Sequence, residues 1–209
     1  MPRNVEIKAK VHDVAKLHQC AAQLSNSEGE ILHQEDTFFC SPKGRLKLRV
    51  LKDDNEELIY YERPDQEGPK CSDYVKVSRK NGELSGDVCK LLTRCLGVKG
   101  AMRKTRTLYM VDQTRVHVDS VDGLGDFMEL EVGLQLSSVI WAMTYSSRCG
   151  RMLYIEHALV SGFSHCQVVL RDDQTVEDGE KIASDLRLKL GIKEEDLLSE
   201  AYMDMILKK

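Results

Sequence analysis

The sequence predicts an α+β fold in which strands curl into a closed or nearly closed barrel with flanking helices. Three observations support this prediction. Apolar and polar residues alternate in several segments, as they do in strands. Amphipathic helical segments lie between and after these strands. The polar side of the strands is almost entirely charged. Because helices with apolar stripes can cover one face of the sheet, the charged face is left to line a barrel interior.

The first half of the chain contains four predicted strands and one helix. Residues 4–11 alternate between apolar odd-numbered positions and charged positions 6, 8 and 10. Asp13 is expected to cap a helix that runs to about Leu24. Residues 45–50 repeat the alternation of the first strand, and turn residues separate the strands that follow. These further strands cover residues 57–63 and 73–79.

The second half contains helices at either end of three predicted strands. Ser85 opens a helix that ends at Gly97, and its inward face is expected to include Val88, Leu91, Leu92 and Cys95. Strands are predicted over residues 103–111, 114–120 and 126–132. A capping box beginning at Thr175 predicts a helix that ends at Gly191. A last helix is expected from about Glu194.

Residues 133–167 differ from the rest of the chain. They contain three charged residues among 35, whereas the other 174 residues contain 61, and their 18 apolar residues follow no sustained period. The flanking segments 129–132 and 168–171 read as consecutive pieces of one strand-and-turn pattern. Two interpretations stay open: an in-frame insertion over about 133–168, such as a retained intron, or a genuine buried hairpin or helix. Transcript sequencing across the Val132 and Val168 codons distinguishes them.

Length and composition limit the class of protein. The 209 residues are expected to form a single domain, residues 1–209, with a substantial core. A balance of 30 Lys and Arg against 34 Asp and Glu argues against a protein that binds nucleic acid through bulk positive charge. The longest apolar run, residues 139–143, is far too short to span a membrane. Seven cysteines without a CxxC pair indicate reduced thiols. We therefore expect a cytoplasmic protein with no nucleic-acid or membrane partner, and its oligomeric state stays open.

The charged strand faces carry the functional signal. They hold ten cations and four carboxylates, an excess of positive charge within a chain of net charge −4. The cations are Lys8, Lys10, Arg45, Lys47, Arg49, Arg63, Lys76, Lys104, Arg106 and Arg115, and the carboxylates are Glu6, Asp119, Glu129 and Glu131. Scattered ion pairs on an exposed sheet would explain any one strand, but the repetition over six strands favours an enclosed site.

The residue types of this face suit phosphate chemistry. Guanidinium and ammonium groups bind phosphate oxygens. Glu6, Glu129 and Glu131 offer the hard oxygen ligands that Mg²⁺ or Mn²⁺ prefers. Cations for phosphate together with carboxylates for a divalent metal are the minimal equipment for phosphoryl or nucleotidyl transfer.

Short motifs in a fixed order strengthen this interpretation. Residues 4–8, Asn-Val-Glu-Ile-Lys, are similar to an ExExK signature. Further motifs lie at residues 34–39, 44–49, 60–64, 104–106, 117–119 and 123–131. Together they resemble the CYTH superfamily of triphosphate-tunnel proteins, which includes class IV adenylyl cyclases and thiamine triphosphatases. The resemblance covers about 1–132 and 168–192, and the Arg-Leu-Lys-Leu-Arg and Tyr-Glu-Arg-Pro pieces are closer to the cyclase-type branch.

The resemblance implies an eight-stranded antiparallel tunnel that binds the triphosphate chain of a small molecule. Phosphate oxygens would be held by Lys8, Lys10, Lys47, Arg49, Arg63, Lys104 and Arg106, with Arg115 and His117 also binding substrate. The divalent cation would be held by Glu6, Glu129, Glu131 and Asp119. Catalysis is expected of Glu6, Lys8, Glu129 and Glu131. In a hydrolase, water attacks the terminal phosphorus; in a cyclase, the ribose 3′-oxygen attacks the α-phosphate and pyrophosphate leaves.

Two departures from the family pattern widen the range of functions. Asn4 stands where the signature has its first Glu, which weakens the metal site. The block after Val132 falls where a further strand would follow, and displacing that strand would open the tunnel wall. Three functions follow: a metal-dependent triphosphate hydrolase first, an adenylyl cyclase second, and a catalytically weak phosphate- or nucleotide-binding protein third.

Overall fold

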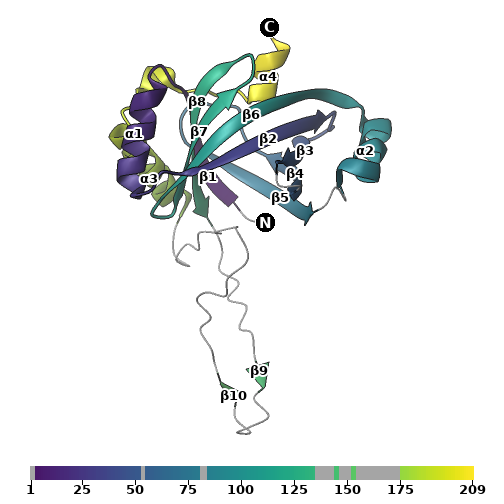
Figure 1. The fold of residues 1–209 in the computed structure, drawn as a ribbon, viewed down its shortest axis with the longest axis horizontal. Coiled ribbons are helices and arrows are strands. Elements are labelled where there is room, and N and C mark those ends of the chain that lie inside the picture. Colours follow the sequence, from purple (N-terminus) through teal and green to yellow (C-terminus); the bar gives the residue numbers. More distant parts are fainter. Residues whose placement is uncertain (1–2, 53–54, 81–83, 135–143, 146–151, 154–174) are drawn as a thin grey trace.

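The computed structural model describes residues 3–52, 55–80, 84–134, 144–145, 152–153 and 175–209. Eight antiparallel strands close into a barrel in the order β1-β5-β4-β3-β2-β6-β7-β8 (Figure 1). Their bounds are β1 Arg3–Lys10, β2 Glu30–Phe39, β3 Arg45–Leu51, β4 Asn55–Glu62, β5 Lys70–Lys80, β6 Val98–Val111, β7 Thr114–Val121 and β8 Gly125–Leu134. The predicted fold class, an α+β barrel of eight antiparallel strands with flanking helices, is confirmed.

The barrel closes where β1 pairs with β8, from Arg3 opposite Leu134 to Lys10 opposite Phe127. The block after Val132 therefore displaces no strand of the barrel wall, because β8 pairs directly with the first strand. Most of the atypical block 133–168 lies outside the described residues. Within it, β9 (Thr144–Tyr145) and β10 (Met152–Leu153) form an antiparallel pair. The insertion hypothesis stays a prediction.

Seven of the eight barrel strands correspond to predicted strands, and β2 is the one that the alternation did not predict. Its outward positions include the polar residues His33, Glu35 and Thr37, and its inward positions include Gln34 and Asp36. Polar residues on both faces remove the apolar period that identifies a half-buried strand.

Two helices cover the outer face of β1, β6, β7 and β8 (Figure 1). The first, α1 (Val14–Ser25), is capped by Asp13, whose side chain accepts a hydrogen bond from the Lys16 backbone. The second, α3 (Val176–Lys189), begins with the predicted capping box of Thr175 and Asp178. Both predictions are confirmed. The core beneath these helices includes Val5, Ile7, Ala9, Leu17, Ala21, Val116, Val118, Met128, Leu130, Ala183 and Leu186.

A smaller apolar cluster lies under α2 (Cys89–Leu96), which follows a π-helical segment, Leu84–Val88. The helix ends at Gly97 as predicted, but two expected inward residues are exposed, Leu91 and Cys95. The backbone kinks at Gly86, and the regular helix begins only afterwards. Its packed residues are consequently Val88, Cys89, Leu92 and Leu96, which contact the cluster of Phe39, Leu48 and Leu84.

The C-terminal segment differs from the long last helix that the sequence predicted. A short 3₁₀ turn, Glu194–Asp196, is followed by extended chain. Leu197 forms a β-bridge with Ala9, and the Leu198 N–H donates to the Lys8 carbonyl oxygen at 2.9 Å. This pairing with β1 replaces helical hydrogen bonds. The helix proper, α4 (Tyr202–Leu207), packs against one end of the barrel. No helix in the described part of the chain is long and apolar enough to cross a membrane.

Candidate functional site

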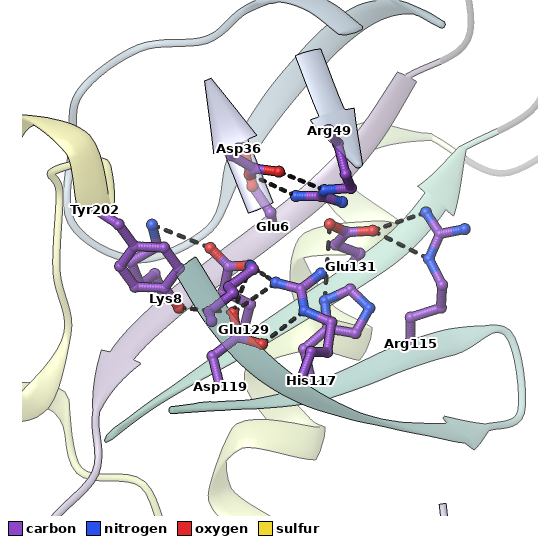
Figure 2. A network of polar contacts seen from close by, with 12 residues as sticks. Glu6, Lys8, Asp36, Arg49, Arg115, His117, Asp119, Glu129, Glu131 and Tyr202 are labelled. Carbon is purple, nitrogen blue, oxygen red and sulfur yellow. Dashed lines mark hydrogen bonds and ion pairs between the residues drawn. The ribbon is translucent and has the colours of Figure 1, made fainter. Parts of the chain in front are cut away.

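The strand alternation directs the charged residues into the barrel. On β1, Val5 and Ile7 belong to the core beneath the helices, so Glu6 and Lys8 point the opposite way. Register then places Glu6 opposite Glu131, and Lys8 opposite Glu129. The same alternation on β7 directs His117 and Asp119 inward. Figure 2 shows these side chains converging from different strands.

Within the described residues, eight cations of this interior form ion pairs with six carboxylates. The cations are Lys8, Lys47, Arg49, Arg63, Lys76, Lys104, Arg106 and Arg115, and the carboxylates are Glu6, Asp36, Glu57, Asp119, Glu129 and Glu131. Burial of so many charges is costly unless each is paired or hydrogen-bonded, and here they pair with one another. This ion-paired set has an excess of two positive charges.

The most buried part of this network surrounds Asp119, whose side chain is 0% exposed. It accepts hydrogen bonds from Lys104 Nζ at 2.8 Å and from Arg106 Nε at 2.6 Å. Burial raises the pKa of Asp119, but Arg106 and Lys104 outweigh this effect and hold that pKa below its ordinary value. Burial and the neighbouring Arg106 lower the pKa of Lys104 to about 8. Asp119 therefore stays ionised and fixes both cations.

Glu129 joins this part of the network to β1. Lys8 Nζ lies 3.0 Å from Glu129 Oε1, and Arg106 donates to Oε2 of the same carboxylate. Burial raises the pKa of Glu129, whereas Lys8, Lys104 and Arg106 lower it, and the result lies well below the ordinary value. Burial lowers the pKa of Lys8, although Glu129 opposes this effect.

Tyr202 of α4 completes this end of the interior and was not predicted. Its hydroxyl donates to Asp119 Oδ2 at 3.1 Å, and Lys8 Nζ lies 3.7 Å from the centre of its ring (Figure 2). Phe127 packs against the same ring, with 5.0 Å between the ring centres. The residue is 83 positions from Asp119 in sequence, so no local pattern connects the two.

Two carboxylates of the network were also absent from the predicted site. Asp36 on β2 accepts hydrogen bonds from Lys47 at 2.9 Å and from Arg49 at 2.8 Å and 2.9 Å. Glu57 on β4 accepts from Lys76 at 2.8 Å. Asp36 lies within the family motif of residues 34–39, and this position in the motif could have identified it as a site residue. Glu57 gives no signal by itself, because one acidic residue in a strand is ordinary.

The predicted substrate-binding residues are not all in one place. Arg63 lies 2.7 Å from Glu6, and Arg115 lies 2.7 Å from Glu131, the residue opposite Glu6 on β8. Lys10 stands apart from the ion-pair network: its ammonium donates to the Leu124 carbonyl oxygen at 3.2 Å and lies over the Phe127 ring. The remaining predicted cations belong to the paired network described above.

One group of described residues has the chemistry of a metal site. Ligand atoms of His117, Glu129 and Glu131 lie within 4.8 Å of one another. Burial and Arg106 lower the pKa of His117 to about 3, which keeps the imidazole neutral, as a metal ligand must be. His117 Nδ1 is buried and has no hydrogen-bond partner in the described part of the chain. Of the other predicted ligands, Glu6 pairs with Arg63, and Asp119 pairs with Lys104 and Arg106.

Comparison with known proteins identifies the family. The sequence model of the CYTH domain family matches residues 2–137. The chain belongs to the CYTH domain family. A relative from Methanocaldococcus jannaschii, MJ0240, named as a candidate adenylate cyclase, is 27% identical over 139 residues, which cover 61% of this chain and 75% of the relative.

Solved structures share the fold of this CYTH protein. The PH1012 protein from Pyrococcus horikoshii OT3 has a TM-score of 0.65 at 19% identity and covers 96% of this chain and 98% of its own. A Vibrio parahaemolyticus protein, also named as a candidate adenylate cyclase, has a TM-score of 0.60 at 14% identity, with coverage of 99% and 98%. At these identities the likeness establishes the fold alone.

The departure from the CYTH signature has a definite location in the structure. Asn4 is buried on β1, opposite Ser72 of β5 and Gly133 of β8. Its side-chain oxygen has no hydrogen-bond partner in the described part of the chain. A carboxylate here would add a seventh negative charge to the interior, whereas the amide leaves a buried oxygen available to a ligand.

Proposed function

We propose that this CYTH protein is a divalent-metal-dependent enzyme that hydrolyses inorganic triphosphate or an organic triphosphate. The observation that carries the proposal is the enclosed interior in which eight cations are paired with six carboxylates. The cations can bind a polyanion, and the carboxylates can bind its metal ion. The excess of cations attracts the polyanion to the barrel.

Binding would proceed by an exchange of partners. Phosphate oxygens suit the guanidinium of Arg106 and the ammonium of Lys8, which pair with Glu129 in the structure. When these cations turn to phosphate, the Glu129 carboxylate is released and would bind the divalent cation. Each buried charge would then have a partner of opposite sign, so the exchange avoids the cost of an unpaired buried charge.

The residues His117, Glu129 and Glu131 would hold the divalent cation. The two carboxylates are oxygen ligands of the kind that Mg²⁺ or Mn²⁺ prefers, and the neutral imidazole of His117, with its unpartnered Nδ1, is available as a third ligand. When bound, the ion would neutralise negative charge on the transferring phosphoryl group. Opposing cations hold the pKa of Glu131 well below its ordinary value despite burial, so this side chain serves as an ionised ligand and not as a proton donor.

The test of the proposal is product identification after incubation with tripolyphosphate, ATP or thiamine triphosphate and Mg²⁺ or Mn²⁺. Orthophosphate release that stops on addition of EDTA supports the hydrolase. Glu129→Gln should abolish turnover, because it removes a metal ligand and a partner of Lys8. Glu35→Gln is the matched control, since Glu35 pairs with Arg103 on the exposed outer face. An unaffected rate in Glu129→Gln would contradict the site assignment.

An adenylyl cyclase is the second candidate, and the name of the M. jannaschii relative favours it. The same incubation with ATP distinguishes the two, because a cyclase yields cyclic AMP and pyrophosphate. The third candidate is a catalytically weak binding protein, favoured by Asn4 in place of the signature glutamate. Tight tripolyphosphate binding without turnover, together with turnover gained in Asn4→Glu, would establish that function.

A further inference from the structure

We infer that a second ligand site, separate from the charged interior, lies between α4 and the loop that joins β2 to β3. It is a cavity of about 290 Å³, close to the lower end of the size range of small-molecule sites. We assign to it a small organic anion, whose charged group binds Arg45 and Lys99 and whose apolar part packs against the cavity wall. The inference is independent of the proposed function, because the residues of this site differ from those proposed for catalysis.

The cavity is distinct from the paired charges inside the barrel. Within the described residues, its lining includes none of the cations and carboxylates that pair with one another there. Phe38 borders both spaces: it lines the cavity, and Lys47 Nζ of the paired interior lies 5.6 Å from the centre of its ring. Phe38 also belongs to the apolar cluster of Tyr202 and Met203. These apolar side chains separate the two sites, so each can hold its own ligand.

The two cations of the cavity have hydrogen-bond donors available to a ligand. Within the described residues, Arg45 donates only through Nη2, to Asp65 at 2.7 Å and 2.9 Å and to Asp204 at 2.9 Å. Its Nε and Nη1 can therefore bind a ligand, and two such donors match the oxygens of a carboxylate or phosphate. Lys99 donates to Asp204 at 2.6 Å, which uses one of its three donors. The charged end of the cavity thus suits an anion.

Asp204 holds the position that the charged group of a ligand would take. Its carboxylate bridges Arg45 and Lys99, the two cations that line the cavity. The side chains of Lys99 and Asp204 are 38% and 23% exposed, and such partly solvated ion pairs contribute little to stability. A ligand carboxylate or phosphate can therefore share these cations with Asp204 or replace it. Because Asp204 competes with the ligand, removing its charge should strengthen binding.

The remaining wall of the cavity is apolar and held in place. Phe39, Leu46 and Met203 line it, and Phe39 and Leu46 also pack in the cluster under α2. The loop at this wall is fixed to the start of β6, because the Cys40 N–H donates to the Gly97 carbonyl oxygen at 3.1 Å. A wall that is already ordered reduces the entropy lost on binding. Apolar surface beside cationic donors fits an anion that carries an aromatic or aliphatic body.

The first experiment uses the wild type and is independent of how any variant folds. Calorimetry in EDTA at constant ionic strength measures binding of benzoate and phenyl phosphate, with and without tripolyphosphate. Both probes should bind at one site per chain, and tripolyphosphate should not change the affinity for benzoate. Acetate lacks the apolar body and should bind at least about tenfold more weakly than benzoate. Benzamide lacks the charge and should show no measurable binding.

The second experiment changes the charges of the cavity. Asp204→Asn should bind benzoate about fivefold more tightly, a gain that misfolding cannot produce. Arg45→Met should weaken benzoate binding by about tenfold or more. Lys99→Gln should weaken it by about fivefold and leave tripolyphosphate binding unchanged. Asp87→Asn, in an exposed ion pair with Lys90, is the matched control and should behave as the wild type does.

Three results would overturn the inference: benzoate binding that tripolyphosphate abolishes, equal benzoate binding by the wild type and a folded Arg45→Met, or no gain in Asp204→Asn. Failure of the proposed function looks different. Wild-type protein that binds benzoate but neither binds nor hydrolyses tripolyphosphate would overturn the proposed function and support the second site.

Discussion

Two ends of the barrel hold the same kinds of charged residue in different surroundings: the α4 end, with Asp119 and Lys104 next to Tyr202, and the Arg115 end, with Lys76, Arg115 and Glu131. At the α4 end, Asp119 has three partners, Lys104, Arg106 and Tyr202, and no exposed surface. At the Arg115 end, Glu131 pairs mainly with Arg115, and both are partly solvated. Charges with several buried partners contribute to the integrity of the fold, whereas solvated pairs can rearrange at little cost. We therefore expect substitutions at the α4 end to affect stability more than substitutions at the Arg115 end.

The largest expected effect is on stability, from substitution at the α4 end. Asp119→Asn leaves Lys104 and Arg106 buried without their common anion, and should lower the free energy of unfolding by about 3–5 kcal/mol. Glu131→Gln, the matched substitution at the Arg115 end, should lower it by about 1 kcal/mol or less. Chemical denaturation of both variants measures the difference. Equal losses would contradict the distinction between the two ends.

The next effect is on ligand binding. Lys8→Ala should weaken tripolyphosphate binding by about a hundredfold, because it removes a buried cation that we propose binds phosphate, and it leaves Glu129 with one fewer cation. Binding to the wild type should fall steeply with added salt, and the variant should show a shallower salt dependence. Calorimetry over a salt series tests both expectations. Lys90→Ala, on the exposed surface of α2, is the control and should bind as the wild type does.

Stability should also depend on pH through buried carboxylates such as Asp36. Burial raises its pKa, but Arg49 and Lys47 hold the folded-state value below the ordinary 3.8. The unfolded chain therefore binds this proton more readily, and the stabilisation present at neutral pH is lost as pH falls through about 4 and below. The loss is about 1.4 kcal/mol per pH unit for each such group. Denaturation of Asp36→Asn should show a flatter acid limb, whereas Asp87→Asn, on the exposed surface, should match the wild type.

The smallest effect is expected at the Arg115 end. Lys76 is partly solvated and pairs with Glu57, so Lys76→Ala should weaken tripolyphosphate binding by only about threefold and leave stability nearly unchanged. If Lys76→Ala weakened binding as much as Lys8→Ala, the distinction between the two ends of the barrel would be wrong.

The sequence predicted those parts of the molecule whose two faces differ. On β1, β7 and β8 one face packs under helices and the other is charged, so alternation identified the strands and directed Glu6, Lys8, Glu129 and Glu131 inward. The strand β2 was not predicted by alternation, because both of its faces carry polar residues. Asp36 and Glu57 become site residues only through pairing with neighbouring strands.

The role of Tyr202 depends on tertiary structure that local patterns do not contain. The C-terminal chain forms a bridge with Ala9 of β1 before α4 begins, and this contact places Tyr202 next to Asp119. The sequence predicted a last helix from about Glu194, whereas the pairing of Leu197 and Leu198 with β1 delays the helix until Tyr202. Long-range backbone hydrogen bonds thus explain why the predicted C-terminal helix begins later and why Tyr202 was not predicted as a site residue.

A crystal structure with tripolyphosphate and Mg²⁺ would show whether the charged interior is the binding site. We expect one tripolyphosphate inside the barrel, with its terminal phosphate bound by Lys8 and Arg106, and the metal ion held by Glu129 and Glu131. A ligand bound only on the outer surface, with the ion pairs of the interior unchanged, would contradict it.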